Sequence, residues 1–318
     1  MVQSKRITKL ESDLWISDGM DLSVPGRTGT YILPGDSLAV IETGPSSSIP
    51  RLKENLQEIG YSFKDIRYII VTHIHLDHAG GAGLLIQECP NAEIIVHPKG
   101  ARHLEEPSRL IKGARSVYGA DFDRLFDPVL PIPAARITSV AHEETLPLSA
   151  ERMLTFHHTP GHAAHHISIH DSLSNGIFTG DTIGIQYVDA IPHNRQIFLP
   201  TTSPNQFDPE QMLASLNYLL SLQPAAIYFG HFGKSENMTA LSTQLRYWLP
   251  LFIERAEKFA ADANSVEGLK NDLYREVLDY YELPLLEDDD PLAFLLQLDM
   301  HVCAMGLLDY VKKKQQNN

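Results

Sequence analysis

The sequence predicts an α/β fold followed by a helical C-terminal segment, and three patterns predict it. Short apolar, β-rich runs alternate with glycine- and proline-containing turns in the first forty residues. An apolar run at residues 67–71 leads through a polar turn into a helix-like segment, which is the strand–turn–helix order of α/β folds. After residue 237, apolar residues recur at helical spacing. We therefore predict a sheet-containing domain over residues 1–236 and a C-terminal helical cap over residues 237–318.

The expected elements of the N-terminal half follow from turn signals and hydrophobic spacing. A helix over residues 48–60 has apolar residues at helical spacing and ends at Gly60. Residues 99–133 are predicted to form helical pieces followed by a proline-containing loop. This insertion forms either a lip of the pocket or a surface segment without contact to substrate. The strands predicted in this half cover residues 14–16, 30–33, 38–41, 67–71 and 93–97.

The second half is predicted to begin with strands and to end with helices. Strand-like alternation resumes at Met153, and Asp208 with Pro209 forms a typical helix start. Pro250 is expected to kink the first C-terminal helix, and the acidic run at residues 287–290 is expected to cap the last. The three C-terminal helices are predicted over residues 237–263, 266–281 and 291 to about 312.

Composition and charge exclude several classes of partner. The chain has 318 residues, enough for a sizeable core, and its net charge of −14 disfavours binding to nucleic acid phosphates or anionic membranes. We see no apolar run of the roughly 18 residues that a membrane span needs. The two cysteines, Cys89 and Cys303, fit no metal or redox spacing. We therefore expect a cytoplasmic protein that acts on a small-molecule substrate, with no nucleic acid or membrane partner, and leave a homodimer open.

The segment directly after the strand at residues 67–71 carries the strongest chemical signal. Three histidines and one aspartate fall within residues 73–78, at the strand edge where ligand sites of α/β folds lie. Imidazole and carboxylate donors together suit zinc, iron or manganese. His73 and His75 alternate as on a strand and can face one ion, whereas Asp77 and His78 lie past the turn and can reach a second. This segment is predicted to bind metal.

The motif His-x-His-x-Asp-His behind an apolar strand resembles the signature of the metallo-β-lactamase superfamily of dinuclear metallohydrolases. Three later motifs resemble the family's remaining ligands in the family's order. They are Thr-Pro-Gly-His ending at His162, Thr-Gly-Asp ending at Asp181 and Gly-His ending at His231. The resemblance covers roughly residues 10–235. It departs at Glu42, where the family usually has aspartate; this position is expected to support the site and not to bind metal.

The resemblance implies a four-layer αββα metallo-β-lactamase sandwich with two divalent metal ions, for which zinc is expected and iron or manganese are alternatives. Of its seven implied ligands, one ion is bound by His73, His75 and His162 and the other by Asp77, His78 and His231. The seventh ligand, Asp181, bridges the two ions. Two cations roughly 3.5–4 Å apart lower the pKa of a shared water, so that a hydroxide attacks a carbonyl or phosphoryl group. Asp77 would also orient this hydroxide and is therefore a predicted catalytic residue.

The predicted function is a dinuclear metal-dependent hydrolase of a small ester, thioester or lactone. Large apolar side chains in the predicted cap favour an acyl group over a polyanion. The helical C-terminal segment resembles that of hydroxyacylglutathione hydrolases, although the glycine-rich, cationic stretch expected for glutathione is absent. Tyr187 resembles the tyrosine with which acyl-homoserine lactonases stabilise an oxyanion, so it is the second predicted catalytic residue. The alternative for Tyr187 is a residue of the core or of the pocket's lip.

Two other functions fit the same metal ligands. A phosphodiesterase would use both ions, with Arg195 and Lys234 as the nearest cations in the sequence. A metal-containing ligand-binding or signalling protein would keep the ligands and show only weak hydrolysis. We also expect residues 237–318 to close over the metal face, with His301 either facing the pocket or packed in the last helix.

Overall fold

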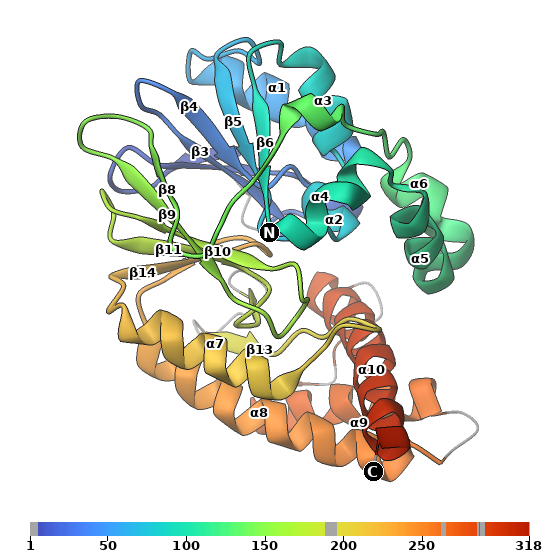
Figure 1. Ribbon diagram of the computed structural model, residues 1–318. Coiled ribbons are helices and arrows are strands. Elements are labelled where there is room, and N and C mark those ends of the chain that lie inside the picture. Colours follow the sequence, from blue (N-terminus) through green and yellow to red (C-terminus); the bar gives the residue numbers. More distant parts are fainter. Residues whose placement is uncertain (1–5, 188–195, 262–264, 285, 287–289, 318) are drawn as a thin grey trace. The chain divides into compact units, whose positions relative to one another are not determined.

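The computed structural model describes the chain except residues 1–5, 188–195, 262–264, 285, 287–289 and 318 (Figure 1). Its contacts divide the chain into two compact units. The first unit consists of residues 1–159, 165–181 and 219–236, and the second consists of residues 160–164, 182–218 and 237–318. The C-terminal helices therefore share a unit with two earlier segments of the chain. The domain boundary expected after residue 236 stays a prediction.

The first unit contains two β-sheets, whose strands are mainly those expected from the sequence. The seven-stranded sheet runs in the order β1-β2-β3-β4-β5-β6-β7, antiparallel from β1 to β4 and parallel from β4 to β7. Its strands are β1 (Ile7–Lys9), β2 (Trp15–Asp18), β3 (Gly29–Leu33), β4 (Leu38–Ile41), β5 (Ile66–Ile70), β6 (Glu93–Val96) and β7 (Ile137–Ser139).

The six-stranded sheet runs in the order β15-β14-β11-β10-β9-β8. It is antiparallel except between β11 and β14, which lie parallel because a helical crossover joins them. Its strands are β8 (Thr145–Pro147), β9 (Met153–His158), β10 (Ile167–Asp171), β11 (Gly176–Gly180), β14 (Ala226–Phe229) and β15 (Lys234–Ser235). The shortest of these strands, β8 and β15, were not predicted.

The two sheets pack against each other through a shared apolar core. In this core Tyr31 of the first sheet lies edge-on to Phe178 of the second, with ring centroids 4.9 Å apart, and Phe178 stacks on Tyr228 at 4.7 Å. Each such aromatic side chain contributes roughly 1.5–3 kcal/mol by its burial. Neighbouring residues of β5 face opposite sides, since Ile70 joins this core and Ile69 joins the core on the outer face. Residues 69–71 of the predicted strand are therefore buried on both sides, as expected for a parallel strand, whereas Arg67 is exposed.

Helices cover the outer face of the seven-stranded sheet. The apolar stripe of α1 (Ile49–Glu58), with Leu52 and Leu56, packs into the same outer core as the residues of α3 (Ala82–Glu88). The expected sandwich of sheets with an outer helical layer is confirmed. The remaining helices of this unit are α2 (Leu76–Ala79), α4 (Pro98–Glu105), α5 (Ser108–Tyr118) and α6 (Phe122–Phe126).

The second unit is built mainly from helices, with a two-stranded sheet. Its sheet pairs β12 (Ile185–Tyr187) with β13 (Ile197–Leu199), and α8 packs on β13 and on the other two C-terminal helices. The helices are α7 (Pro209–Ser221), α8 (Met238–Phe259), α9 (Ser265–Tyr280) and α10 (Pro291–Asn317). The three predicted C-terminal helices are confirmed, and Pro250 lies inside α8.

Among the described residues, one helix is long and apolar enough to span a membrane by length and composition alone, over Pro291–Gln316 of α10. The sequence interpretation overlooked this stretch. Of its most apolar 18-residue window, 61% is buried inside the protein, as in a core helix. This feature is therefore weak evidence for a membrane span.

Candidate metal centre

The first group of candidate ligands lies where β5 ends and α2 begins. His73 follows the strand, His75 forms the N-cap of α2 in an extended conformation, and α2 itself carries Asp77 and His78. The short helix α2 was not expected, because the sequence analysis treated this segment as a polar turn before the helix. The rings of His73 and His78 have centroids 4.3 Å apart, and those of His73 and His75 are 4.5 Å apart. The strand end and the single helical turn therefore bring these side chains together.

Asp181 and His231 reach the same edge from the second sheet. Each follows the end of a strand, Asp181 after β11 and His231 after β14, and these strands are parallel neighbours. Both strand ends need glycine, because a Cβ on Gly180 would lie 2.4 Å from Thr72 Oγ1, and one on Gly230 would lie 2.6 Å from His78 Cε1. The glycines of the Thr-Gly-Asp and Gly-His motifs thus allow a close approach between the two sheets.

Side-chain nitrogen and oxygen atoms have the spacing of ligands around one ion in a second group, which consists of Asp77, His78, Asp181 and His231. His78 Nε2 lies 3.3 Å from Asp181 Oδ1, and His231 Nε2 lies 3.3 Å from Asp181 Oδ2. Asp77 Oδ2 lies 3.6 Å from His78 Nε2 and 3.5 Å from His231 Nε2. Tetrahedral ligands at about 2.0–2.2 Å from zinc are themselves roughly 3.3–3.6 Å apart. The donor set present in the structure therefore fits a divalent metal ion.

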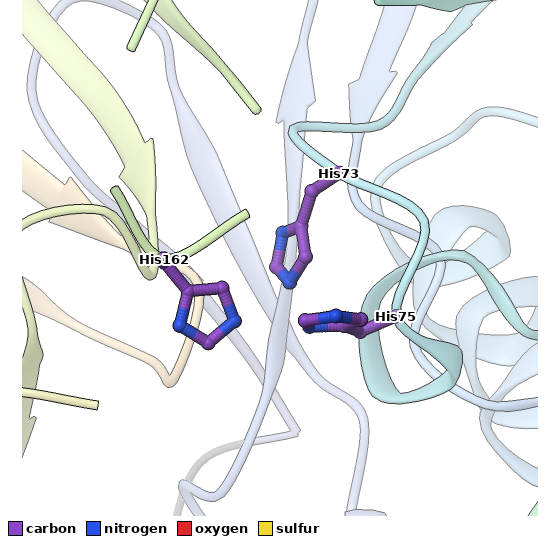
Figure 2. A group of neighbouring side chains, drawn as sticks. All are labelled: His73, His75 and His162. Carbon is purple, nitrogen blue, oxygen red and sulfur yellow. The ribbon is translucent and has the colours of Figure 1, made fainter. Parts of the chain in front are cut away.

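Figure 2 shows His73, His75 and His162, the three histidines that are predicted to bind one ion. His162 is presented by the Pro160–Gly161 turn, in which Gly161 has a φ of +143°. His162 Nδ1 lies 3.1 Å from the carbonyl oxygen of Thr201. Because a carbonyl oxygen only accepts, Nδ1 carries the hydrogen and Nε2 keeps its lone pair for a metal ion. The assignment of His162 to one ion with His73 and His75 stays a prediction.

The electrostatics of the centre favour a bound cation. Burial alone would lower the pKa of His78, but Asp181, Asp77 and Glu42 hold it well above its ordinary value. Burial alone would raise the pKa of Asp181, but His231 and His78 hold it well below the usual range. Burial, together with the neighbouring His78 and His75, lowers the pKa of His73 well below its ordinary value. Buried carboxylates that draw positive charge onto one histidine are suited to a divalent ion, which would replace the proton.

Glu42 lies behind the histidines, in a third group of possible donors with His73 and His78. It has a φ of +66°, accepts a short hydrogen bond from the hydroxyl of Thr72, and lies 3.5 Å from His78 Nδ1 through Oε1. Thr72 Oγ1 also lies 3.0 Å from His73 Nδ1. Glu42 thus lies beside Nδ1 of His78, whereas Asp181 lies beside Nε2. A carboxylate in the position of Glu42 can orient a ligating imidazole.

Sequence reasoning missed Asp21, a buried carboxyl group near the centre. Burial raises the pKa of Asp21 to about 6. Asp77 also raises this pKa, whereas Arg27 and His231 lower it. Asp21 lies in a turn where Met20, Leu22 and Ser23 have φ values of 49°, 55° and 63°. Left-handed backbone at three such residues often marks a constrained functional segment. No motif in the sequence signals this group, because its environment comes from residues far away in the chain.

Tyr187, His301 and two further histidines have partners of their own. Tyr187 is buried in β12, and its hydroxyl donates a hydrogen bond of 2.5 Å to Asp299 Oδ2, so its contact with a substrate oxyanion stays a prediction. His166 Nε2 accepts a hydrogen bond from the backbone N–H of Asp181, which makes it a support for that residue. The ring of His165 lies 5.6 Å from that of His75. His301 lies 3.4 Å from Glu267 of α9.

A two-sheet α/β sandwich with histidine and carboxylate ligands at its strand ends defines a metal-binding fold of the metallohydrolase class. The family model of the metallo-beta-lactamase superfamily matches residues 25–231. The chain therefore belongs to the metallo-beta-lactamase superfamily, and its recognition from the sequence is confirmed. This membership also confirms the fold class.

Curated relatives agree with this family. The metallo-beta-lactamase fold-containing protein ST1585 of Sulfurisphaera tokodaii is 29% identical over 214 residues, which cover 66% of this chain and 74% of the relative. The probable metallo-hydrolase MJ0888 of Methanocaldococcus jannaschii is 33% identical, over 49% of this chain and 67% of the relative. The N-acyl homoserine lactonase AttM of Agrobacterium fabrum is 25% identical, over 56% of this chain and 62% of the relative.

Solved structures share the fold over nearly the whole chain. The archaeal superfamily protein ST1585 from Sulfolobus tokodaii matches with a TM-score of 0.65 at 21% identity, covering 92% of this chain and 97% of that one. The family protein TTHA1429 from Thermus thermophilus matches with a TM-score of 0.64 at 18% identity, covering 95% and 94%. At these identities the likeness concerns the fold alone.

Proposed function

We propose that the protein is a hydrolase that uses two divalent metal ions, with zinc as the expected metal, to cleave a small ester, thioester or lactone. The observation that carries the proposal is the spacing of 3.3 to 3.6 Å between the Nε2 atoms of two buried histidines and the oxygens of two carboxylates. Imidazole and carboxylate donors at this spacing suit zinc, iron or manganese. When bound, two such ions would supply a water nucleophile at neutral pH and an electrophile for the substrate oxygen.

The chain's own residues have distinct parts in this proposal. One ion would be bound by three histidines, His73, His75 and His162. The other ion would be bound by Asp77, His78 and His231, and both ions would share the carboxylate of Asp181. The side chain of Asp77 is 20% exposed, whereas that of Asp181 is 4% exposed, so Asp77 is the carboxylate that solvent reaches and that can accept a proton from the attacking water.

The acyl substrate class rests on two supports. Among the curated relatives are N-acyl homoserine lactonases, and a lactone presents the carbonyl carbon that such a centre attacks. The net charge of −14 also disfavours polyanionic substrates, because phosphate-rich ligands need a cationic surface. The two alternative functions are a phosphodiesterase and a metal-dependent binding protein with weak hydrolysis. The test must distinguish both from a hydrolase of acyl substrates.

The test compares electrophiles on one metal-loaded preparation. Metal-stripped protein is reconstituted with zinc, iron or manganese, and kcat/KM is measured for a matched aryl ester, thioester and lactone and for a bis-aryl phosphodiester. We expect the carbonyl substrates to be cleaved at least tenfold faster. His78→Ala should lose activity and metal together, whereas His103→Ala on α4 is the matched control and should keep both. Faster phosphodiester cleavage would replace the acyl assignment, and metal binding with no turnover would favour the binding protein.

A further inference from the structure

The turn that carries His162 is held by the loop at residues 200–208 and by α7, in which the hydroxyl of Ser215 donates to the carbonyl oxygen of Pro160 at 2.6 Å. The hydroxyl of Ser203 donates to the carbonyl oxygen of His162 at 3.0 Å, while the carbonyl oxygen of Thr201 accepts from His162 Nδ1 at 3.1 Å. The N–H of Asp208 donates to the carbonyl oxygen of Gly161 at 2.8 Å. Both the backbone and the ring of His162 therefore depend on where this loop lies.

The loop is in turn held by the C-terminal helix α10. The hydroxyl of Thr202 donates to the carbonyl oxygen of Cys303 at 3.0 Å. The N–H of Asn205 donates to Asp309 Oδ2 at 3.0 Å, and Lys313 Nζ donates to the carbonyl oxygen of Asn205 at 2.9 Å. These contacts extend over three turns of α10, so the helix holds the loop along its length and not at one point.

Gly306 makes the closest approach between the helix and the loop. A Cβ built on this residue would lie 2.5 Å from Thr202 Oγ1 and 2.9 Å from the backbone nitrogen of Ser203. Contacts this short do not occur, so any side chain at this position must push the loop away from the helix. Glycine is otherwise unfavourable in a helix interior, which indicates that the close approach is the reason for it.

We infer that α10 acts as a positioning element for His162: through Gly306 and the loop at residues 200–208, it sets the ring orientation and the tautomer of this predicted metal ligand. This inference rests on the proposed function for the role of His162, but the chain of contacts lies wholly within the second unit. An imidazole free in water prefers the hydrogen on Nε2, which would block metal binding there. The Thr201 carbonyl, fixed by α10, selects the hydrogen on Nδ1 and leaves Nε2 as the ligand atom.

The test substitutes Gly306→Ala and uses Gly113→Ala as a matched control. Gly113 lies inside helix α5, and a Cβ built on it meets nothing within 4 Å. Alanine is the better helix former at both positions, so loss of helix stability cannot explain a defect. Nitrogen NMR of the metal-stripped proteins reports the tautomer of His162, with its signals assigned by their loss in His162→Ala. Gly306→Ala should shift the ring towards the Nε2–H form and weaken binding of one zinc ion by roughly 10- to 100-fold. Gly113→Ala should leave both measurements unchanged.

A second pair of variants removes the risk that Gly306→Ala fails to fold. Thr202→Val deletes the hydroxyl that bonds to Cys303 and should lower zinc affinity in the same direction, whereas Thr202→Ser keeps the hydroxyl and should restore it. A wild-type tautomer and zinc affinity in both Gly306→Ala and Thr202→Val would overturn the inference. If His162→Ala keeps both metal ions, the ligand assignment of the proposed function fails instead, and the tautomer shift still decides whether α10 positions the ring.

Discussion

Substituting Glu42→Gln should weaken metal binding without unfolding the protein. Glu42 is buried, with 2% of its surface exposed, and its Oε1 lies 3.5 Å from His78 Nδ1. A carboxylate in this place increases the basicity of a ligating imidazole and fixes its orientation. Glutamine has the same shape and can still accept the hydrogen bond from Thr72, so the substitution removes mainly the negative charge.

The expected size of the effect follows from this geometry. Two unit charges 3.5 Å apart attract by about 5 kcal/mol at an effective dielectric constant of about 20, which is an upper bound. Relief of the cost of burying the carboxylate opposes this loss, as does the retained hydrogen bond. Substitutions of outer carboxylates of this kind reduce metal affinity roughly 10- to 100-fold, or about 1.4–2.7 kcal/mol. We expect the same range for Glu42→Gln.

Competition between the metal-stripped protein and a chromophoric chelator measures this affinity directly. Glu58→Gln, at an exposed position in α1, provides the same chemical change away from the centre and should leave the affinity unchanged. Urea unfolding of both variants without metal checks that the fold is intact. Glu42→Gln protein that binds both zinc ions as tightly as the wild type would refute the argument that this carboxylate supports His78.

Three further predictions concern neighbouring groups. Asp181→Ala should lose most of the bound metal, because its two oxygens lie 3.3 Å from two different histidines, whereas His165→Ala should lose much less; elemental analysis of both variants distinguishes them. Tyr187→Phe should lower kcat for carbonyl substrates roughly 100-fold at unchanged metal content if its hydroxyl leaves Asp299 to stabilise the oxyanion, and an unchanged kcat would assign it a packing role only. Burial and neighbouring cations lower the pKa of His97 to about 4, so its contribution to stability is present above pH 6.5 and is lost as the pH falls towards 4. His97→Asn keeps an N-cap for α4 and should abolish roughly 2 kcal/mol of this pH dependence, measured by urea unfolding at both ends of the range.

The sequence predicts the first sheet well because its signals are local. The runs around Tyr31 and Ile69 combine β-branched or aromatic residues with flanking turn residues, and the structure has strands there. It predicts short elements less well. The strand β12 at Tyr187 and the single turn of α2 depend on pairing and capping contacts that a run of three or four residues does not encode.

The candidate ligands were found from motifs because each motif is a short, continuous run of the sequence that follows a strand. Their supports were not, because these come from distant parts of the chain. The acceptor for His162 is the backbone carbonyl oxygen of Thr201. Every residue type has such an oxygen, so the sequence does not reveal this contact. Asp21 resembles an ordinary turn residue until the fold buries it. Only the structure shows that such groups lie close to predicted ligands.

The placement of charge around His78 favours a bound cation. Its ring is 1% exposed and lies between Glu42 on one nitrogen and Asp77 and Asp181 on the other. Without a metal ion, three carboxylates near one buried ring must be balanced by a proton, and the raised pKa of His78 expresses this demand. His78 would have to lose this proton to ligate a divalent ion, so metal affinity should increase as the pH rises. A bound ion would therefore stabilise the folded protein, because binding to the folded state alone shifts the unfolding equilibrium.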